Sequence, residues 1–282
     1  MSFLEIYGHT LEVERIPGAG NRATVVMLHE GLGSVSMWRD FPKRLAAHTA
    51  HAVVVYSRLG YGKSDPLPDR IDAGTDTGTS ALGPRRNLRQ PDFMHREAFE
   101  VLPALLAALD IERPVLFGHS DGGSIALLYA SQHPVTGVIA MAPHVRVEDV
   151  SIKSIEEARV AWVSTDLKQK LGKHHDDVEG AFRGWNDVWL HPDFRVWNIE
   201  AELPLIKAPI LAIQGEQDQY GTLYQIEEIQ RRNARTRLFK IPDCKHSPHR
   251  DQPDVVMGAV QSFLATLPEL KRADLPAGLR TA

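Results

Sequence analysis

One short stretch, Pro114 to Leu128, limits the possible folds of this chain more than any other. Its apolar run Val115 to Phe117 has the length and composition of a buried strand, and the residues from Ser124 onward are typical of a helix with apolar faces. The turn between them carries glycines on both sides of Ser120. A turn this tight brings the strand and helix backbones together, so Cβ atoms beside the serine would clash or force unfavourable dihedral angles. The pattern Gly-x-Ser-x-Gly therefore predicts a strained turn that projects the serine hydroxyl beside the first N–H groups of a helix.

The rest of the chain alternates apolar runs with helical patterns. Two runs on either side of Gly8-His9 alternate apolar and polar residues, which predicts an antiparallel hairpin. The later runs are mostly continuous, as expected for strands buried on both faces of a sheet. We expect strands at Phe3–Tyr7, Leu11–Ile16, Thr24–Leu28, Ala52–Tyr56, Val115–Phe117, Gly137–Ala142, Ile210–Gln214 and Thr236–Ile241. Helices are predicted at Met37–Ala47, Glu97–Leu109, Ser124–Ala130 and Val255–Leu264. This alternation predicts an α/β fold with a mostly parallel, twisted sheet of about eight strands and helices on both faces.

Two segments interrupt the alternation. Asp69 to Pro91 is polar, rich in Gly, Thr, Arg and Pro, and too long for an ordinary connection, so we expect a mobile loop. Residues 146–204 follow the sixth predicted strand, show helical patterns and contain four of the five tryptophans. We therefore expect a helical cap over an apolar pocket, inserted into a core of residues 1–145 and 205–270, with residues 271–282 as a tail. One apolar stripe at helical spacing in the cap comprises Val178, Ala181, Phe182, Trp185, Val188 and Trp189.

Composition narrows the functional classes. A net charge of −4 over 282 residues gives no reason to expect nucleic acid or an anionic membrane as a partner. The single cysteine, Cys244, excludes an internal disulfide and a cysteine zinc cluster. The first residues lack the basic segment followed by an apolar segment that is typical of a signal peptide. No apolar run approaches the ~18 residues that a membrane span needs. We expect a soluble, cytoplasmic protein.

A serine nucleophile needs a base within hydrogen-bond reach, and the base needs an anion that fixes its tautomer. Asp218 follows the strand Ile210–Gln214, and His246 follows the strand Thr236–Ile241. Because loops at the carboxyl ends of parallel strands converge on one crevice, both can meet Ser120 there. His249 is the competing base. The competing carboxylates, for which we expect surface salt bridges, are Glu216, Asp243, Glu148 and Asp149.

From Thr24 to Leu267 the chain resembles the α/β-hydrolase superfamily, in its branch with a helical cap. The motifs that carry the resemblance are the turn His29 to Gly33, Ser57-Arg58-x-Gly60-x-Gly62-x-Ser64, the turn around Ser120, Gly215-x-x-Asp218, and Lys245-His246-Ser247-Pro248-His249 with Gln252-Pro253. The resemblance implies Ser120 as nucleophile, His246 as base and Asp218 as orienting acid. It also implies two oxyanion donors, the backbone N–H of Asp121 and that of Gly31, with Leu32 as the alternative.

The chain departs from the family pattern at two positions. Glu30 stands where relatives usually have glycine, and we expect its side chain to pair with Arg58 rather than to act in catalysis. Lys245 also stands where relatives often have glycine. The sequence Ser120-Asp121-Gly122-Gly123 resembles biphenyl-hydrolase-like esterases, in which an acidic group in the pocket favours amino-bearing substrates. Asp121 alternatively caps the following helix or pairs with an arginine.

The pocket is predicted to be lined by Glu30, Leu32, His144, Trp162, Trp185 and Trp189. We expect the polar run His174-His175-Asp176-Asp177 to be a solvated face rather than a metal site, and we expect no cofactor or metal. The resulting hypothesis is a serine hydrolase that cleaves a small ester, lactone or thioester-like bond, with an apolar or aromatic acyl group. The alternatives are a hydrolase of carbon–carbon bonds in aromatic ring-fission products and a non-catalytic ligand receptor. Haloalkane dehalogenases and epoxide hydrolases are disfavoured because their nucleophile is aspartate. The oligomeric state stays open.

Overall fold

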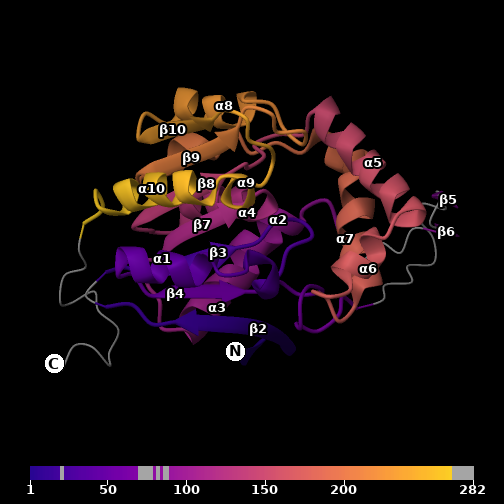
Figure 1. Cartoon of the computed structure of the whole chain (residues 1–282), viewed down its shortest axis with the longest axis horizontal. Helices are drawn as coiled ribbons and strands as arrows, with labels where there is room; N and C mark the ends of the chain where they lie inside the picture. Colours follow the sequence, from indigo (N-terminus) through magenta and orange to yellow (C-terminus); the bar gives the residue numbers. More distant parts are fainter. Residues whose placement is uncertain (20–21, 69–78, 81–82, 85–88, 269–282) are drawn as a thin grey trace.

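A computed structural model describes residues 1–19, 22–68, 79–80, 83–84 and 89–268. Its centre is an eight-stranded sheet in the order β1-β2-β4-β3-β7-β8-β9-β10 (Figure 1). β1 pairs antiparallel with β2 and β2 antiparallel with β4, and the remaining neighbours are parallel. The strands are β1 (Ser2–Ile6), β2 (His9–Ile16), β3 (Val25–Leu28), β4 (Val53–Tyr56), β7 (Val115–His119), β8 (Gly137–Met141), β9 (Ile210–Gly215) and β10 (Thr236–Ile241). The predicted mixed α/β sheet is confirmed.

Helices cover both faces of the sheet because the central strands are apolar on both sides. In β3, Val25 and Met27 face a cluster that contains α1 (Phe41–Thr49) and α10 (Pro253–Leu264). Val26 and Leu28 face the opposite cluster, with α4 (Asp121–Gln132) at its centre. The same cluster includes residues of α2 (Phe93–Arg96), α3 (Leu102–Ala108) and α8 (Tyr224–Arg232).

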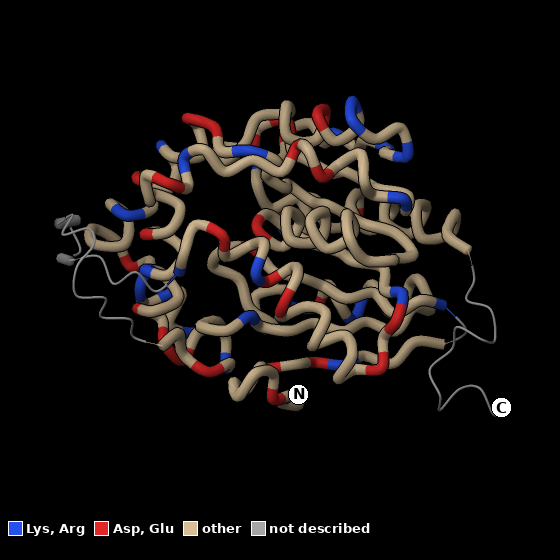
Figure 2. Tube along the Cα trace, turned by 180° about the vertical axis from the view of Figure 1, so that it is seen from behind, with Lys and Arg blue, Asp and Glu red and all other residues tan. Residues whose placement is uncertain are grey.

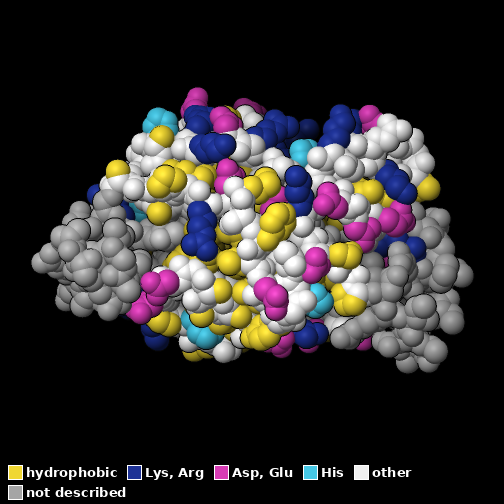
Figure 3. All heavy atoms as spheres, turned by 90° about the horizontal axis from the view of Figure 1, so that it is seen from below, with side chains coloured by type: hydrophobic (Ala, Val, Ile, Leu, Met, Phe, Trp, Pro, Cys, Tyr) yellow, Lys and Arg dark blue, Asp and Glu magenta, His cyan; other side chains and the backbone are white. Residues whose placement is uncertain are grey.

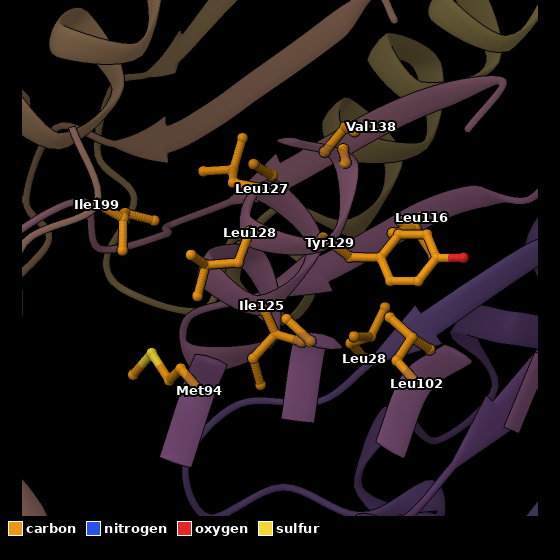
Figure 4. Packing of buried hydrophobic residues seen from close by; sticks show 14 of the residues in the cluster. Leu28, Met94, Leu102, Leu116, Ile125, Leu127, Leu128, Tyr129, Val138 and Ile199 are labelled. Atoms are coloured by element: carbon orange, nitrogen blue, oxygen red, sulfur yellow. The ribbon is translucent and has the colours of Figure 1, made fainter. Parts of the chain in front are cut away.

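The packing around α4 fixes the helix that begins at the predicted serine turn. Ile125, Leu127 and Leu128 of α4 are fully buried. Figure 4 shows these side chains in one buried cluster with Leu28 and Leu116 of the sheet. Burial of one such leucine contributes about 1.5–3 kcal/mol, so several of them hold the start of α4 against the end of β7.

Residues between β8 and β9 form a separate layer of helices beyond one end of the sheet (Figure 1). This layer contains α5 (Asp149–Ser164), α6 (Leu167–Leu171) and α7 (Val178–Trp189). Two 3₁₀ helices follow it in the chain, η3 (Pro192–Val196) and η4 (Leu203–Leu205), and η4 packs against α4 of the core. The ends of the insertion meet, because Arg146 bridges Asn198 and the Ile199 N–H donates to the Val145 carbonyl (2.8 Å). α7 coincides with the predicted apolar stripe. The division into separate core and cap domains stays a prediction.

Several predicted boundaries were wrong by a few residues. The helix expected at Met37–Ala47 is split into a 3₁₀ turn, η1 (Val35–Trp38), and α1, because Arg39 has a φ of 55° that no α-helix accommodates. The helix expected at Glu97–Leu109 begins earlier, at α2, and passes through the π-helical segment η2 (Glu97–Val101) before α3. Pro103 of α3 lacks the N–H that would bond to the carbonyl four residues earlier, which interrupts the regular ladder there.

The predicted loop Asp69–Pro91 and the predicted tail 271–282 lie largely or wholly outside the described residues. Within the loop, the described strands β5 (Thr79–Ser80) and β6 (Gly83–Pro84) pair as a small antiparallel hairpin. Among the described residues, the remaining short helix is α9 (Pro248–Asp251).

Charged residues lie mostly along the outer segments of the chain trace (Figure 2). On the face shown in Figure 3, acidic, basic and apolar side chains are interspersed rather than gathered by kind. Within the part of the chain that the structure describes, no helix has both the length and the apolar character needed to cross a membrane. Several charged side chains depart from this pattern, and among them Arg58 and Asp121 are 0% and 1% exposed.

Candidate functional site: a serine, a histidine and an aspartate at the carboxyl ends of the strands

The turn between β7 and α4 has the strained geometry that its glycines predicted. Ser120 has φ 53° and ψ −120°, a conformation that is costly for a residue other than glycine. A Cβ atom on Gly118 would lie 2.0 Å from the Gly122 carbonyl oxygen, and one on Gly122 would lie 2.2 Å from the Leu28 carbonyl oxygen. Both neighbours are backbone atoms that cannot move aside. Only glycine at these two positions lets the backbones of β3, β7 and α4 come this close.

Three side chains from distant parts of the chain meet at this turn. The Ser120 Oγ lies 2.9 Å from the His246 Nε2, and the His246 Nδ1 lies 2.9 Å from both Asp218 carboxylate oxygens. Asp218 follows β9 and His246 follows β10, so the parallel order of the strands brings both loops to the end of β7. The arrangement lets an imidazole accept a proton from the hydroxyl while the carboxylate holds the opposite ring nitrogen.

Further hydrogen bonds hold the Asp218 carboxylate. Its Oδ1 accepts from the Tyr220 N–H (2.8 Å) and its Oδ2 from the Gln214 Nε2 (3.2 Å). Burial by itself acts to raise the pKa of Asp218, but the facing His246 and the hydrogen bond from the Tyr220 N–H outweigh it and lower the pKa. Asp218 is therefore an anion at neutral pH.

The competing residues lie elsewhere. His249 is buried between Trp38 and Phe41, with ring centroids 4.9 and 5.8 Å away, and has no contact with the Ser120 hydroxyl. Asp149 pairs with Arg195, as expected of a surface salt bridge. Two of the carboxylates make hydrogen bonds instead: Glu148 accepts from Thr222 and Gln225, and Asp243 accepts from Gln217. Glu216 is exposed.

Two backbone segments border the Ser120 hydroxyl. Asp121 is the first residue of α4, and the first N–H groups of a helix have no acceptor within the helix. Gly31 and Leu32, in the turn after β3, line the same cavity as Ser120. The Leu32 carbonyl is held by the His175 Nε2 (3.0 Å), and the Gly33 N–H donates to the Glu30 carbonyl (3.0 Å). The turn is thus tied both to itself and to the segment before α7.

The prediction that Glu30 pairs with Arg58 is wrong. The Glu30 carboxylate lies 3.1 Å from the Arg250 Nη2 and 3.4 Å from the His119 Nδ1. Arg58 instead donates to the backbone carbonyl of Glu30 (2.9 Å), because it is buried beneath the turn rather than beside the carboxylate. Burial acts to raise the pKa of Glu30, and the pairing with His119 and Arg250 outweighs it, leaving the pKa well below its usual value.

The Asp121 carboxylate matches the second of its two interpretations, pairing with an arginine. Its Oδ1 accepts from the Trp189 Nε1 (3.2 Å), and its Oδ2 lies 3.8 Å from the Arg58 Nη2. Burial raises the pKa of Asp121, and Arg58 opposes this rise. The nearest charged group to this buried carboxylate is thus a side chain of the protein itself, Arg58.

A cavity of about 210 Å³ lies over the serine. Five of the six predicted pocket residues line it: Glu30, Leu32, His144, Trp185 and Trp189. Trp162 is not among the lining residues, because its ring stacks on Phe182 within the helical layer (centroids 4.1 Å apart). Lining residues that the sequence analysis did not name for the pocket include Met37, Ile155, Leu171, Tyr220 and Arg250. Tyr220 and Arg250 lie within four residues of Asp218 and His246, and this proximity was the available signal.

The polar run before α7 is not simply a solvated face. His175 is 4% exposed, and its Nδ1 accepts from the Gly62 N–H (3.0 Å) while its Nε2 donates to the Leu32 carbonyl. Asp177 caps α7 by accepting from the Gly180 N–H (2.9 Å). The expectation fails for His175 because the run packs against the turn after β3, which sequence spacing does not reveal.

Comparison with known proteins gives a consistent family. The model of the "Alpha/beta hydrolase family" matches residues 25–259. The mouse protein named serine hydrolase BPHL is 25% identical over 274 residues, which cover 92% of this chain and 84% of that protein. A 2-hydroxy-6-oxononadienedioate/2-hydroxy-6-oxononatrienedioate hydrolase of Paraburkholderia xenovorans is 33% identical over 113 residues, 39% of this chain and 32% of that protein. The solved enol-lactonase of Burkholderia xenovorans LB400 has a TM-score of 0.69 at 20% identity, covering 94% of this chain and 100% of that one. The resemblance predicted from the motifs is confirmed.

Proposed function

The chain belongs to the alpha/beta hydrolase family, and from this premise we propose that it is a serine hydrolase that cleaves a small carboxylic ester through an acyl-enzyme on Ser120. The observation that carries the proposal is the continuous contact from the Ser120 hydroxyl through His246 to Asp218, with 2.9 Å at each step. Such contacts on a strained turn at the base of a cavity suit nucleophilic catalysis.

In the first step, the Ser120 Oγ attacks the ester carbonyl carbon while its proton passes to the His246 Nε2. The Asp218 carboxylate accepts the Nδ1–H of His246 and stabilises the imidazolium that forms. The N–H groups of Asp121 and Gly31 donate to the oxyanion of the tetrahedral intermediate. The carbon–oxygen bond to the leaving alcohol then breaks, and His246 gives its proton to that oxygen.

Water completes the reaction. It attacks the carbonyl carbon of the acyl-enzyme and gives one proton to the His246 Nε2. The second tetrahedral intermediate collapses, the acid leaves, and the proton returns to the Ser120 Oγ. No group outside this chain and water is needed to balance these steps.

The lining of the cavity supports an apolar or aromatic acyl group. Trp185 and Trp189 supply aromatic surface, and Leu32 and Ile155 supply aliphatic surface. The relative that is 33% identical over 113 residues is named a hydrolase of 2-hydroxy-6-oxononadienedioate and 2-hydroxy-6-oxononatrienedioate, and its name mentions no ester. Carbon–carbon bond hydrolysis of aromatic ring-fission products is therefore the second candidate for the same three side chains.

The test combines covalent labelling with turnover. A fluorophosphonate probe is expected to label wild-type protein on Ser120, and S120A is expected to lose labelling and about 10⁴- to 10⁶-fold of its kcat on a p-nitrophenyl ester. Ser131, at the far end of α4, provides the matched control, and S131A should keep both. Labelled wild-type protein that hydrolyses ring-fission products but no ester would favour the second candidate. Absence of labelling would contradict the proposal and favour a ligand receptor on the same fold.

A further inference from the structure

His144 stands out among the residues that line the cavity. It follows β8, and its ring centroid lies 4.8 Å from that of Trp189 and 6.0 Å from that of His246. Its backbone is held firmly, because its N–H donates to the Ser124 Oγ (3.0 Å) and that hydroxyl donates to the His144 carbonyl (2.7 Å). The ring therefore has a fixed place near the reacting hydroxyl.

The ring packs against Trp189, but the described residues leave one of its nitrogens without a hydrogen bond. His144 is 2% exposed, and its Nδ1 has no hydrogen-bond partner among the described residues. Other buried histidines use their ring nitrogens, since His29 donates to the Glu30 carbonyl and His175 to the Leu32 carbonyl. His249 also has unpartnered nitrogens, but it lies between aromatic rings and does not line the cavity. Because the His144 ring lines the cavity, a ligand bound there can supply a hydrogen-bond partner for it.

The charge state of His144 limits what it can recognise. Burial, reinforced by the nearby His246, lowers the pKa of His144 from 6.5 to about 3. The ring is therefore neutral at physiological pH and offers one donor and one acceptor. A neutral imidazole does not compensate the charge of a carboxylate, and Asp218 and Asp121 nearby disfavour an anion at this place. The matching ligand group is an uncharged oxygen.

We propose that His144 is a specificity-determining residue that hydrogen-bonds a hydroxyl or keto oxygen on the acyl chain of the substrate, a few bonds from the scissile carbonyl. The inference rests on the proposed acyl transfer at Ser120 and adds the substrate class, an ester of an oxygenated acid. The oxygen is placed a few bonds from the scissile carbonyl because the His144 ring lies close to the reacting serine. Its centroid is 6.0 Å from that of His246, and the His246 Nε2 lies 2.9 Å from the Ser120 Oγ. Two polar groups nearby already have hydrogen bonds, since the Asp121 Oδ1 accepts from Trp189 and the Ser151 hydroxyl donates to the Tyr220 carbonyl (2.6 Å).

The experiment compares matched pairs of ethyl esters by proton release. Esters of 2-hydroxy, 3-hydroxy and 3-keto acids are each paired with the analogue in which a methyl or methylene group replaces the oxygen. In wild-type protein we expect at least one oxygenated ester to have a kcat/KM about tenfold or more above that of its partner, because the partner leaves the buried ring unpaired. In H144F this ratio should fall to about 1, and in H144N it should recover in part.

Controls separate this inference from the proposed function. H133F changes a histidine at the far end of α4 and should keep the wild-type ratio. Wild-type protein that is labelled by a fluorophosphonate but hydrolyses both members of every pair equally would overturn this inference alone. A preference that persists in H144F would also overturn it. Protein that is neither labelled nor active on any ester would instead contradict the proposed function. If H144F does not fold, the wild-type ratio and H144N decide the question.

Discussion

Acid should destabilise this fold strongly, because several histidines are buried in their neutral form. His249 gives the clearest case. It is 4% exposed, lies among Trp38, Phe41 and His119, and has no hydrogen-bond partner for either ring nitrogen among the described residues. Burial, with a further contribution from His119, lowers the pKa of His249 well below 6.5. We predict that H249F removes a defined part of the acid sensitivity of the protein.

The magnitude follows from proton linkage. As the pH falls through 6.5, the unfolded chain binds a proton at His249 while the folded protein does not, since its pKa is depressed. The unfolded state then holds more protons, so the free energy of unfolding rises with pH in this window and is lost as the pH falls. Between pH 7 and pH 5, one such histidine removes about 2 kcal/mol of stability. His29 and His144, whose pKa values are also lowered by burial, should add losses of the same kind.

Urea unfolding at pH 7 and pH 5 measures this loss directly. From pH 7 to pH 5, the free energy of unfolding of wild-type protein should fall by about 2 kcal/mol more than that of H249F. At pH 7 H249F should be at least as stable as wild type, because two unpartnered buried nitrogens disappear. His48, exposed on α1, is the matched control, and H48Q should lose as much as wild type. Equal losses in H249F and wild type would refute the reasoning, because they would mean that His249 takes up its proton in the folded state.

Three further predictions concern the site. D218N should lower kcat about 10⁴-fold with little change in KM, since the amide favours the wrong tautomer of the base; a kcat within tenfold of wild type would count against Asp218 as the orienting acid. E30Q should lower kcat about tenfold while KM changes little, because Glu30 faces His119 and the His119 Nε2 donates to the His246 carbonyl (2.7 Å). A raised KM with an unchanged kcat would point to a role in substrate binding instead. G122A should lower the free energy of unfolding by about 3 kcal/mol or more, measured in urea, because its Cβ would meet the Leu28 carbonyl oxygen at 2.2 Å; unchanged stability would show that the turn can open.

The features that the sequence predicted well are those that depend on backbone geometry. Gly118 and Gly122 are needed wherever a strand and helix meet this closely, so their spacing identifies the turn without knowledge of any contact. Asp218 and His246 could be assigned because parallel strands end at one edge of the sheet, whatever their separation along the chain. Both arguments need only the order of the elements.

The features that it missed depend on which side chains face each other after packing. Glu30 was matched with Arg58, yet its partner is Arg250, 220 residues away in α9. His175 was assigned to a solvated run, but the helical layer packs it against Gly62 and Leu32. Trp162 was placed in the pocket, although the rotation of α5 turns it toward Phe182. The spacing of residues predicts which side chains share one face of a helix. It does not predict which side chains of another layer that face will contact.

The departure at Glu30 makes physical sense once its backbone and its side chain are considered separately. The Glu30 carbonyl accepts from the His29 Nδ1 (2.6 Å), the Arg58 Nη2 (2.9 Å) and the Gly33 N–H (3.0 Å), and these contacts would exist with glycine at this position. They fix the turn that carries Gly31, so the geometry of a backbone donor there does not need the carboxylate. What the carboxylate adds is a link from this turn to His119 and Arg250, which border the loop of the base. The glutamate side chain thus links the turn after β3 to the segment around His246. A glycine at this position would leave the two segments without this link.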